Sequence, residues 1–272
     1  MIENITDTEG EFEMSKQKLA IAGTGFLGSI VADAWKAGYL DEYELVGVFG
    51  RNREYTEALA ARVGCKAFYD MDEMLALKPD YVAEAASGQW VREYAEKVSN
   101  AGAGLILISI GAFADEELYE RIKKVNRENN TKVYLASGAV GGFDVLRTIS
   151  LMGDVKAKME SDKNPMPLYY TPLFKEPMLT EKSTAFDGSA KEAIAILPHQ
   201  VNVTVAAALA TAGPENTNLK ITTIPGYIGD DHKITAEVPG VKAVVDIYSS
   251  TSAIAGWSIV AVLQNIVSPI VF

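Results

Sequence analysis

Cysteine and histidine are the scarcest reactive residues in this chain. Cys65 is the only cysteine among 272 residues, so no disulfide can form within the chain, and we expect a reducing, cytoplasmic location. Only two histidines occur, His199 and His232. They are too few for a His/Cys cluster, and the carboxylates show no ligand spacing, so the sequence predicts no metal site.

Positive charge is also in short supply. The chain has 25 lysines and arginines against 36 aspartates and glutamates, and its formal net charge of −11 argues against nucleic acid and anionic membranes as partners. Residues 1–17 lack the apolar core of a secretory signal, so we expect a polar N-terminal extension. The apolar stretch 253–272 is interrupted by polar residues and barely long enough to cross a hydrocarbon layer of ~30 Å, so we expect a buried terminal helix.

Glycine, in contrast, marks the most informative stretch. Three glycines follow the apolar run 18–22 in the spacing G-x-G-x-x-G, and a helical pattern begins at once. Gly23 can turn the chain off the strand, Gly25 leaves room for a pyrophosphate at the backbone, and Gly28 lets the helix pack against the sheet. The helix N-terminus presents free N–H groups to phosphates, so this order predicts dinucleotide binding. The cofactor-binding residues expected here are Gly23, Gly25, Phe26, Leu27 and Gly28.

The end of the next expected strand, residues 44–49, bears on the choice of cofactor. An NAD-selective site places an acid about 20 residues after the last glycine to hold the ribose hydroxyls. This chain has Gly50, Arg51, Asn52 and Arg53 there instead. Because Arg51 can pair with a 2′-phosphate and stack on adenine, we expect Arg51 and Asn52 to bind the cofactor, with NADP preferred and NAD tolerated. The alternative is that these arginines are ordinary solvated charges at a helix start.

Strands and helices alternate over residues 18–136, which predicts an α/β fold: a Rossmann-type domain with a parallel sheet and right-handed crossovers. The run 105–108 is the most hydrophobic and should be a central strand buried on both faces. In such sheets, ligands lie beyond the carboxyl ends of the strands, at the point where the strand order reverses. That rule points to two turns of small residues, in which we expect Ala86, Ser87, Ser109 and Gly111 to contact the cofactor.

From residue 137 the pattern changes to that of a smaller α+β substrate domain, which we expect to cover 137–251. A glycine-rich segment opens it, a loop with four prolines follows, and the strands are expected to be antiparallel. The terminal helix, within 252–272, is expected to pack back on the first domain. The clearest expected elements of the second domain are a helix at 201–212 and strands at 219–224, 232–238 and 241–249.

Proton transfer near neutral pH most often uses histidine, which narrows the catalytic candidates to two. His232 lies at an expected loop-to-strand junction after Asp230 and Asp231, whose charges should favour the protonated imidazole. His199 follows a proline at an expected helix start, where the helix dipole disfavours a cation, and we interpret it as a capping or packing residue. His232 is therefore the candidate catalytic residue.

Seven segments together resemble the L-aspartate dehydrogenase family, and the resemblance runs from about residue 18 to the C-terminus. The most specific are Ser-Gly-Ala-Val-Gly-Gly at 137–142 and Val-Asn-Val at 201–203. The others are the glycine motif at 23–28, Glu-Ala-Ala-Ser at 84–87, Ser-Ile-Gly-Ala at 109–112, Ala-Phe-Asp-Gly-Ser-Ala at 185–190, and His232 itself.

The resemblance implies a Rossmann domain, an α+β catalytic and dimerisation domain, and a homodimer. It also implies NAD(P)-dependent oxidation of L-aspartate to iminoaspartate, which feeds NAD biosynthesis or hydrolyses to oxaloacetate and ammonia. By position, His232 matches the family's catalytic histidine and Asn202 its cofactor-contacting asparagine, while Ala139 lies in the loop that touches the nicotinamide. We name Arg147 and Lys182 as candidates to bind the substrate carboxylates.

At two places the sequence departs from the family pattern, and both are expected to lie near the bound substrate. The family usually has Asn two residues before the histidine, where this chain has Asp230, and a longer polar stretch than Ser-Ser-Thr-Ser at 249–252. A negative Asp230 would repel a dicarboxylate unless it turns away. Two alternatives therefore stay open: an NADP-dependent reductase of another small carboxylate or imine, and a non-catalytic NADPH-binding sensor.

Overall fold

The structure, a computed structural model, describes residues 15–197 and 201–272. Its first half is built around a six-stranded sheet in which every pairing is parallel. The strand order reverses between β1 and β4, the point at which open α/β sheets bind their ligands. In spatial order the strands are β3 (Lys66–Phe68), β2 (Tyr43–Phe49), β1 (Gln17–Ala22), β4 (Tyr81–Glu84), β5 (Gly104–Leu107) and β6 (Val133–Leu135).

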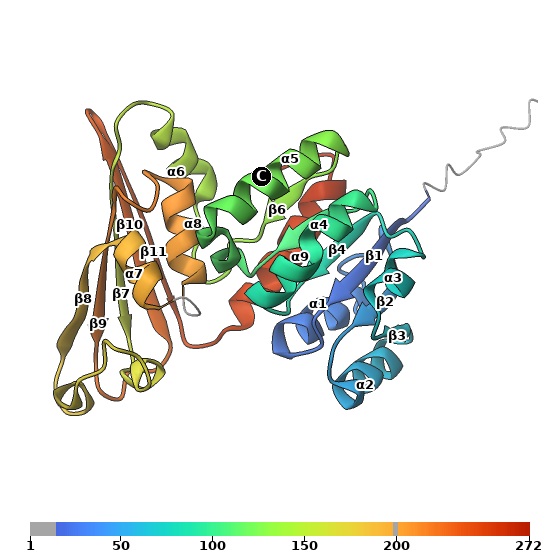
Figure 1. The fold of residues 1–272 in the computed structure, drawn as a ribbon, viewed down its shortest axis with the longest axis horizontal. Coiled ribbons are helices and arrows are strands. Elements are labelled where there is room, and N and C mark those ends of the chain that lie inside the picture. Colours follow the sequence, from blue (N-terminus) through green and yellow to red (C-terminus); the bar gives the residue numbers. More distant parts are fainter. Residues whose placement is uncertain (1–14, 198–200) are drawn as a thin grey trace, which may run out of the picture.

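Helices cover both faces of this sheet (Figure 1). Strand β5, which lies next to the edge strand β6 and not at the centre of the sheet, is fully buried, as the sequence predicts, because its alternate side chains enter two different cores. Leu105 and Leu107 pack on one side of the sheet and Ile106 on the other. The helices of this half are α1 (Phe26–Lys36), α2 (Arg53–Val63), α3 (Met71–Leu75), α4 (Gly88–Asn100), the 3₁₀ turn η1 (Ile110–Ala114) and α5 (Glu116–Glu128).

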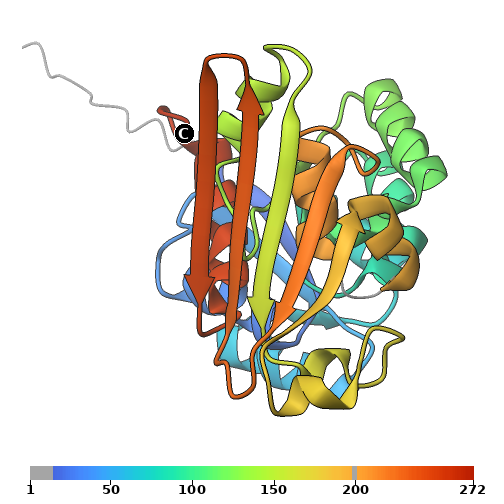
Figure 2. The ribbon, with the colours of Figure 1, turned by 90° about the vertical axis from the view of Figure 1, so that its left-hand side faces the viewer.

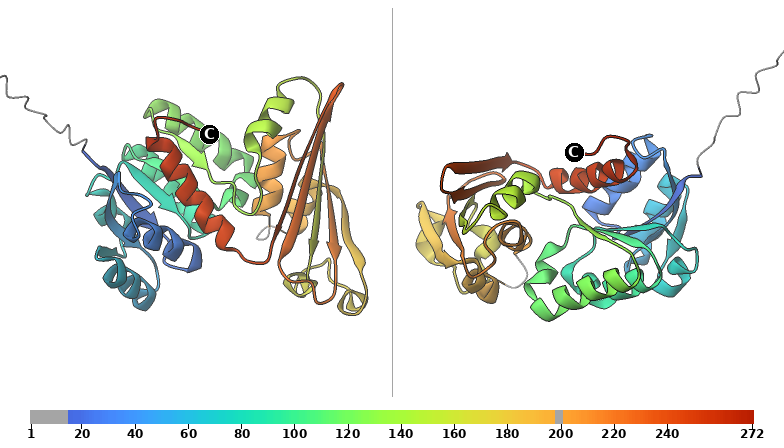
Figure 3. Two further views of the ribbon diagram at one scale, coloured as in Figure 1. Left: turned by 180° about the vertical axis from the view of Figure 1, so that it is seen from behind. Right: turned by 90° about the horizontal axis from the view of Figure 1, so that it is seen from above.

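The last helix, α9 (Ala253–Val267), lies against α1 on one face of the first sheet (Figure 3). A Cβ on Gly256 would come within 2.9 Å of Ile30, so the two helices are in close contact there. The buried Tyr43 hydroxyl donates a hydrogen bond of 2.7 Å to the Leu263 carbonyl. Across the described residues, no helix is both long and apolar enough to span a membrane.

The second half contains a five-stranded sheet with helices on one face only; Figure 2 shows its other face, which no helix covers. The sheet is mixed, because β7 pairs with β9 in parallel, so the expectation of an antiparallel sheet is wrong at this pair. In spatial order the strands are β11 (Val241–Ser249), β10 (Asp230–Val238), β7 (Lys156–Lys163), β9 (Thr217–Thr223) and β8 (Ser183–Ser189). The helices are α6 (Phe143–Ser150), α7 (Ala190–Ile196) and α8 (Asn202–Ala210).

Two elements of this half were not expected from the sequence, β8 and α7. The start of α7 carries a capping box in which Ser189 and Glu192 bond each other's backbone N–H groups, a signature readable in Ser189-Ala-Lys-Glu192. A further correction concerns His232, which lies inside β10 and not at its junction with a loop. His199 lies outside the described residues. We propose that the two halves divide at residues 136 and 137, after β6.

Candidate functional site

The turn between β1 and α1 has the geometry of a phosphate cradle. Gly23 adopts a φ of +113°, and a Cβ there would lie 2.2 Å from the Ala85 carbonyl oxygen. A Cβ on Gly28 would lie 1.9 Å from the Gly23 carbonyl oxygen, so α1 starts directly against the turn. At Gly25 an added Cβ would meet nothing within 4 Å. The backbone is therefore tightly packed at Gly23 and Gly28 and open at Gly25, where a pyrophosphate needs room.

Two adjoining cavities lie along the carboxyl ends of the strands. The central cavity, about 480 Å³, spans the space between the strand-end turns and the N-terminus of α8. The side cavity, about 330 Å³, extends from the glycine turn to the end of β2. Ala85, Ala86, Ser87 and Gln89 line both cavities, so the two adjoin and together mark a path across the point where the strand order reverses.

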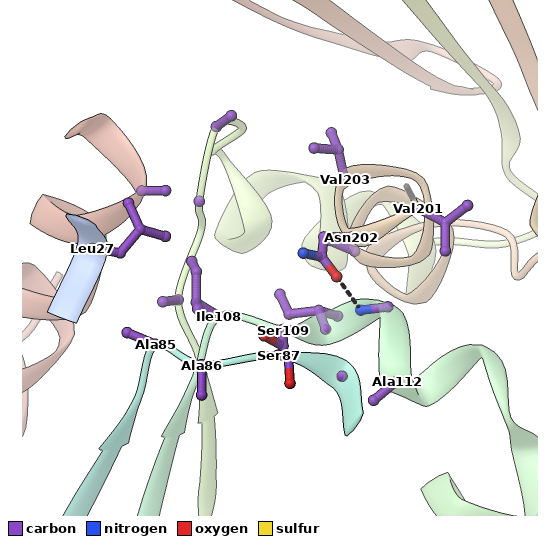
Figure 4. Close-up of a pocket in the computed structure, with 18 of the residues that line it drawn as sticks. Leu27, Ala85, Ala86, Ser87, Ile108, Ser109, Ala112, Val201, Asn202 and Val203 are labelled. Atoms are coloured by element: carbon purple, nitrogen blue, oxygen red, sulfur yellow. Dashed lines mark hydrogen bonds between the residues drawn. The ribbon is translucent and has the colours of Figure 1, made fainter. Parts of the chain in front are cut away.

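The structure brings most of the sequence-predicted cofactor residues onto this path, and Figure 4 shows the central cavity. Phe26, Gly28 and the candidate catalytic residue His232 line neither cavity. Ser87 and Asn52 also cap helices, because their side chains accept the backbone N–H groups of Trp90 and Tyr55. The central cavity is lined by Leu27, Ala86, Ser87, Ser109, Gly111, Ala139 and Asn202, and the side cavity by Gly23, Gly25, Arg51 and Asn52.

A buried carboxylate holds the two turns that border the central cavity. Glu84, at the end of β4, has no exposed surface. One of its oxygens accepts the Ala86 N–H at 2.9 Å and the Ser109 hydroxyl at 2.8 Å. The other accepts the N–H groups of Ile108 at 3.2 Å and Ser109 at 3.0 Å. Burial raises the pKa of Glu84 above its ordinary value, while these four donors act in the opposite direction.

Asn202 links the two halves of the molecule at the cavity. It is the first residue of α8, and its Oδ1 accepts the Gly111 N–H at 2.8 Å. A Cβ on Gly111 would lie 2.6 Å from that oxygen, so this contact requires glycine. Since Oδ1 is occupied by Gly111, the Nδ2 donors remain available, and Figure 4 shows Nδ2 pointing into the cavity.

His232 is buried on the helix-covered face of the second sheet, with only 4 % of its surface exposed. Its Nδ1 and the Ser161 hydroxyl are hydrogen-bonded at 3.0 Å. Burial lowers the pKa of His232 to about 4, the nearby Lys163 acts in the same direction, and Asp230 opposes them. The expectation that neighbouring aspartates keep this imidazole protonated is therefore wrong, because desolvation outweighs the attraction of Asp230.

The Asp230 side chain is paired with a lysine. Lys163 and Asp230 lie directly opposite each other on β7 and β10, with Nζ and Oδ1 3.4 Å apart. Two residues along each strand, and so on the same face of the sheet, Ser161 pairs with His232, and all four residues lie at one end of the covered face. Lys163 thus offsets the negative charge that the departure from the family pattern introduces.

The candidates for binding substrate carboxylates do not lie at the cavities. Arg147, on α6, bonds the Ser150 hydroxyl, and Lys182 lies 3.9 Å from Asp162. Neither lines the central or the side cavity.

The structure also places three residues at or near the site to which the sequence alone assigned no role: Glu84, Lys163 and Arg92. A position at the end of β4 was the available signal for Glu84, whereas Lys163 and Arg92 offered none. Among the described residues, no cluster of three or more His, Cys, Asp or Glu side chains could hold a metal ion.

A parallel sheet with a glycine cradle, two adjoining cavities along its carboxyl edge and a second half whose helix α8 borders the central one define the class of nicotinamide-dinucleotide oxidoreductases. Comparisons with known proteins narrow this class. Residues 23–136 match the family model described as homoserine dehydrogenase, NAD binding domain, and residues 144–266 match aspartate dehydrogenase, C-terminal. The chain is 31 % identical to the L-aspartate dehydrogenase of Methanosarcina acetivorans, over 93 % of this chain and 98 % of that protein.

A second curated relative is the L-aspartate dehydrogenase of Methanococcus maripaludis, 28 % identical over 93 % of this chain and 98 % of that protein. Among solved structures, the aspartate dehydrogenase of Thermotoga maritima aligns with a TM-score of 0.77 at 26 % identity, covering 94 % of this chain and 99 % of that one. The chain belongs to the L-aspartate dehydrogenase family. The resemblance stated from its sequence motifs is confirmed.

Replacing Glu84 with glutamine tests whether the buried carboxylate holds the turns at Ala86 and Ser109 in place. The amide nitrogen cannot accept hydrogen bonds, so at least one buried N–H or hydroxyl donor loses its partner, and we expect a loss of about 1–3 kcal/mol in the free energy of unfolding. The turns at Ala86 and Ser109 should loosen, so NADPH binding, measured by fluorescence titration, should weaken as well. Glu73→Gln, at an exposed position, is the matched control. Equal stability and NADPH affinity for both variants would contradict this role of Glu84.

Proposed function

We propose that this protein is an NADP-preferring L-aspartate dehydrogenase. The observation that carries the proposal is the pair of adjoining cavities that extends from the glycine cradle to Asn202, in a chain whose two halves both match models of dehydrogenases. The path joins a site for the phosphates, a site for the adenosine end and a site for the reacting ring.

The residues along the path fit a dinucleotide. The open space at Gly25 and the free N–H groups at the start of α1 would hold the pyrophosphate. Arg51 in the side cavity would pair with the 2′-phosphate, although Glu93 lines the same cavity and would favour ribose hydroxyls. Asn202 would donate from Nδ2 to the nicotinamide carboxamide. When bound, the nicotinamide supplies the two-electron acceptor that takes the hydride from Cα of L-aspartate, leaving iminoaspartate and a proton.

His232 is proposed as the group that accepts or shuttles this proton. A pKa of about 4 keeps the imidazole neutral near pH 7, so one ring nitrogen is free to accept a proton. The bond between Nδ1 and Ser161 fixes the ring orientation, which would leave Nε2 for the proton transfer. Because His232 does not line the central cavity, this role requires that the bound substrate reach beyond the cavity's present lining.

We also propose the oligomeric state, the location and the metabolic role that the family resemblance implies. We propose that the face of the second sheet that no helix covers is buried in a homodimer. Val244 and Tyr248 are exposed there, because they alternate along β11 with Ala243 and Val245, which pack on the core. With a single cysteine, the chain suits a reducing cytoplasm, where its product would supply NAD biosynthesis. A reductase of another small carboxylate or imine remains the second candidate, because Asp230 departs from the family pattern beside His232.

The direct test is to mix the protein with NADP⁺ and a panel of amino acids and record absorbance of the reduced cofactor. L-aspartate should yield NADPH and ammonia in equal amounts, and oxaloacetate with ammonia should consume NADPH; pyruvate with ammonia is the control. Turnover of a cyclic imine or another keto acid in place of aspartate would favour the second candidate. Cofactor binding without any turnover would indicate a sensor.

Cofactor preference is tested by Arg51→Ala. Loss of one charge-assisted pair with a phosphate should raise KM for NADP about 10–100-fold and leave KM for NAD nearly unchanged. Glu93→Gln, at another residue that lines the side cavity, is the control and should weaken NAD binding while KM for NADP does not rise. A wild-type preference for NAD, or equal effects of Arg51→Ala on both cofactors, would overturn the preference.

The proton-transfer role is tested by His232→Ala, which should lower turnover by roughly 10²–10⁴-fold while NADPH binding persists. Ser161→Ala, which removes only the bond that orients the ring, should have a smaller effect. Unchanged turnover in His232→Ala would exclude the histidine from the mechanism.

The same histidine should make folding stability depend on pH. Its pKa is about 4 in the folded chain against 6.5 ordinarily, so the unfolded state binds the proton first as pH falls. Stability should therefore decrease from about pH 6.5 to about pH 4, and His232→Gln should flatten that part of the curve. Identical pH dependence in chemical denaturation of both proteins would contradict the burial of a neutral imidazole.

A further inference from the structure

The central cavity has a single charged side chain among the described residues that line it, Arg92. All the other lining residues are apolar or uncharged polar. Arg92 belongs to α4, which starts at Gly88 where the turn after β4 ends. Its side chain extends back toward the start of the helix, because a Cβ on Gly88 would lie 3.3 Å from its Nη1.

The guanidinium makes no hydrogen bond or ion pair within the described part of the chain. Three of the other five arginines of this half have partners: Arg62 pairs with Asp33 at 3.1 Å, Arg121 pairs with Glu96 at 3.1 Å, and Arg53 stacks over Tyr69 at 4.3 Å. The planar fork of N–H donors on this exposed, cavity-lining side chain therefore has no protein acceptor among the described residues. That arrangement matches the bidentate geometry of a carboxylate.

The charges of the three possible ligand groups, the substrate, the nicotinamide and the 2′-phosphate, indicate which of them the Arg92 guanidinium would bind. The chain carries a net charge of −11, so an anionic substrate must meet a locally positive group. The oxidised nicotinamide is itself a cation and gains nothing from a neighbouring guanidinium. The 2′-phosphate is expected at Arg51, which lines the side cavity, whereas Arg92 lines only the central one.

We propose that Arg92 binds a carboxylate of the substrate in the central cavity. This assignment rests on the proposed function for the identity of the substrate, and it replaces Arg147 and Lys182 as carboxylate ligands. The ligand class is a small mono- or dicarboxylate, held by a charge-assisted, forked pair at the start of α4. Gly88 contributes by leaving room for the guanidinium to lie over the first turn of that helix.

The test compares Arg92→Gln and Arg92→Lys with the control Arg121→Gln, which removes a paired surface arginine from the neighbouring helix α5. Two quantities are measured: KM for L-aspartate at saturating NADP⁺, and the Kd of succinate, an unreactive dicarboxylate, for the NADPH-loaded protein by fluorescence. Arg92→Gln should raise both about 10–100-fold, and Arg92→Lys should raise them less because it keeps the charge without the fork. The Kd of NADPH should change less than about threefold in all three variants.

Two results would overturn the proposal. In one, Arg92→Gln leaves KM and the succinate Kd at the values of the control. In the other, it weakens NADPH at least as much as succinate, which would make Arg92 a ligand of the cofactor. Failure of the proposed function is separable, because it would appear as a wild-type protein that does not oxidise L-aspartate. The succinate titration would still report whether Arg92 binds carboxylates.

Discussion

The site depends on one buried carboxylate at the end of a central strand. Glu84 accepts four hydrogen bonds from the two turns that follow β4 and β5, and so fixes the backbone that borders the central cavity. Leaving any of these donors unpaired in the interior would be unfavourable, so the carboxylate and the two turns hold one arrangement together. The reversal of strand order opens a crevice at this edge, and Glu84 gives that crevice a rigid border.

The second half of the chain completes the site through a contact that also orients a ligand group. Asn202 uses its oxygen for the Gly111 N–H and keeps its amide N–H groups for the cavity, so one side chain both joins the two halves and presents donors. In this acidic protein, a few positively charged side chains lie at or beside the site. Arg51 lines the side cavity, Arg92 lines the central cavity, and Lys163 is paired with Asp230 beside the neutral His232.

Much of this arrangement follows from local sequence, and the remainder follows from contacts between distant segments. The parallel sheet, the buried β5 and the steric needs of Gly23 and Gly28 were predictable, since strand periodicity and glycine geometry are local properties. The neutral state of His232 was not predictable, because burial decides it, and the residues adjacent in sequence do not indicate burial. The parallel pairing of β7 with β9 and the position of Arg92 over Gly88 likewise depend on how separate elements meet. Glu84 looks in sequence like any acid at a strand end; only the fold brings Ser109 to it.

The position of the nicotinamide ring relative to Asn202 and His232 decides whether this site works as proposed. A crystal structure of the protein with NADP⁺ and succinate would test it. The nicotinamide carboxamide should lie within hydrogen-bonding distance of Asn202 Nδ2, with the ring over the turns at Ala86 and Ser109 and the His232 imidazole on its substrate side. A ring bound elsewhere, or an imidazole remote from both ring and succinate, would contradict the account.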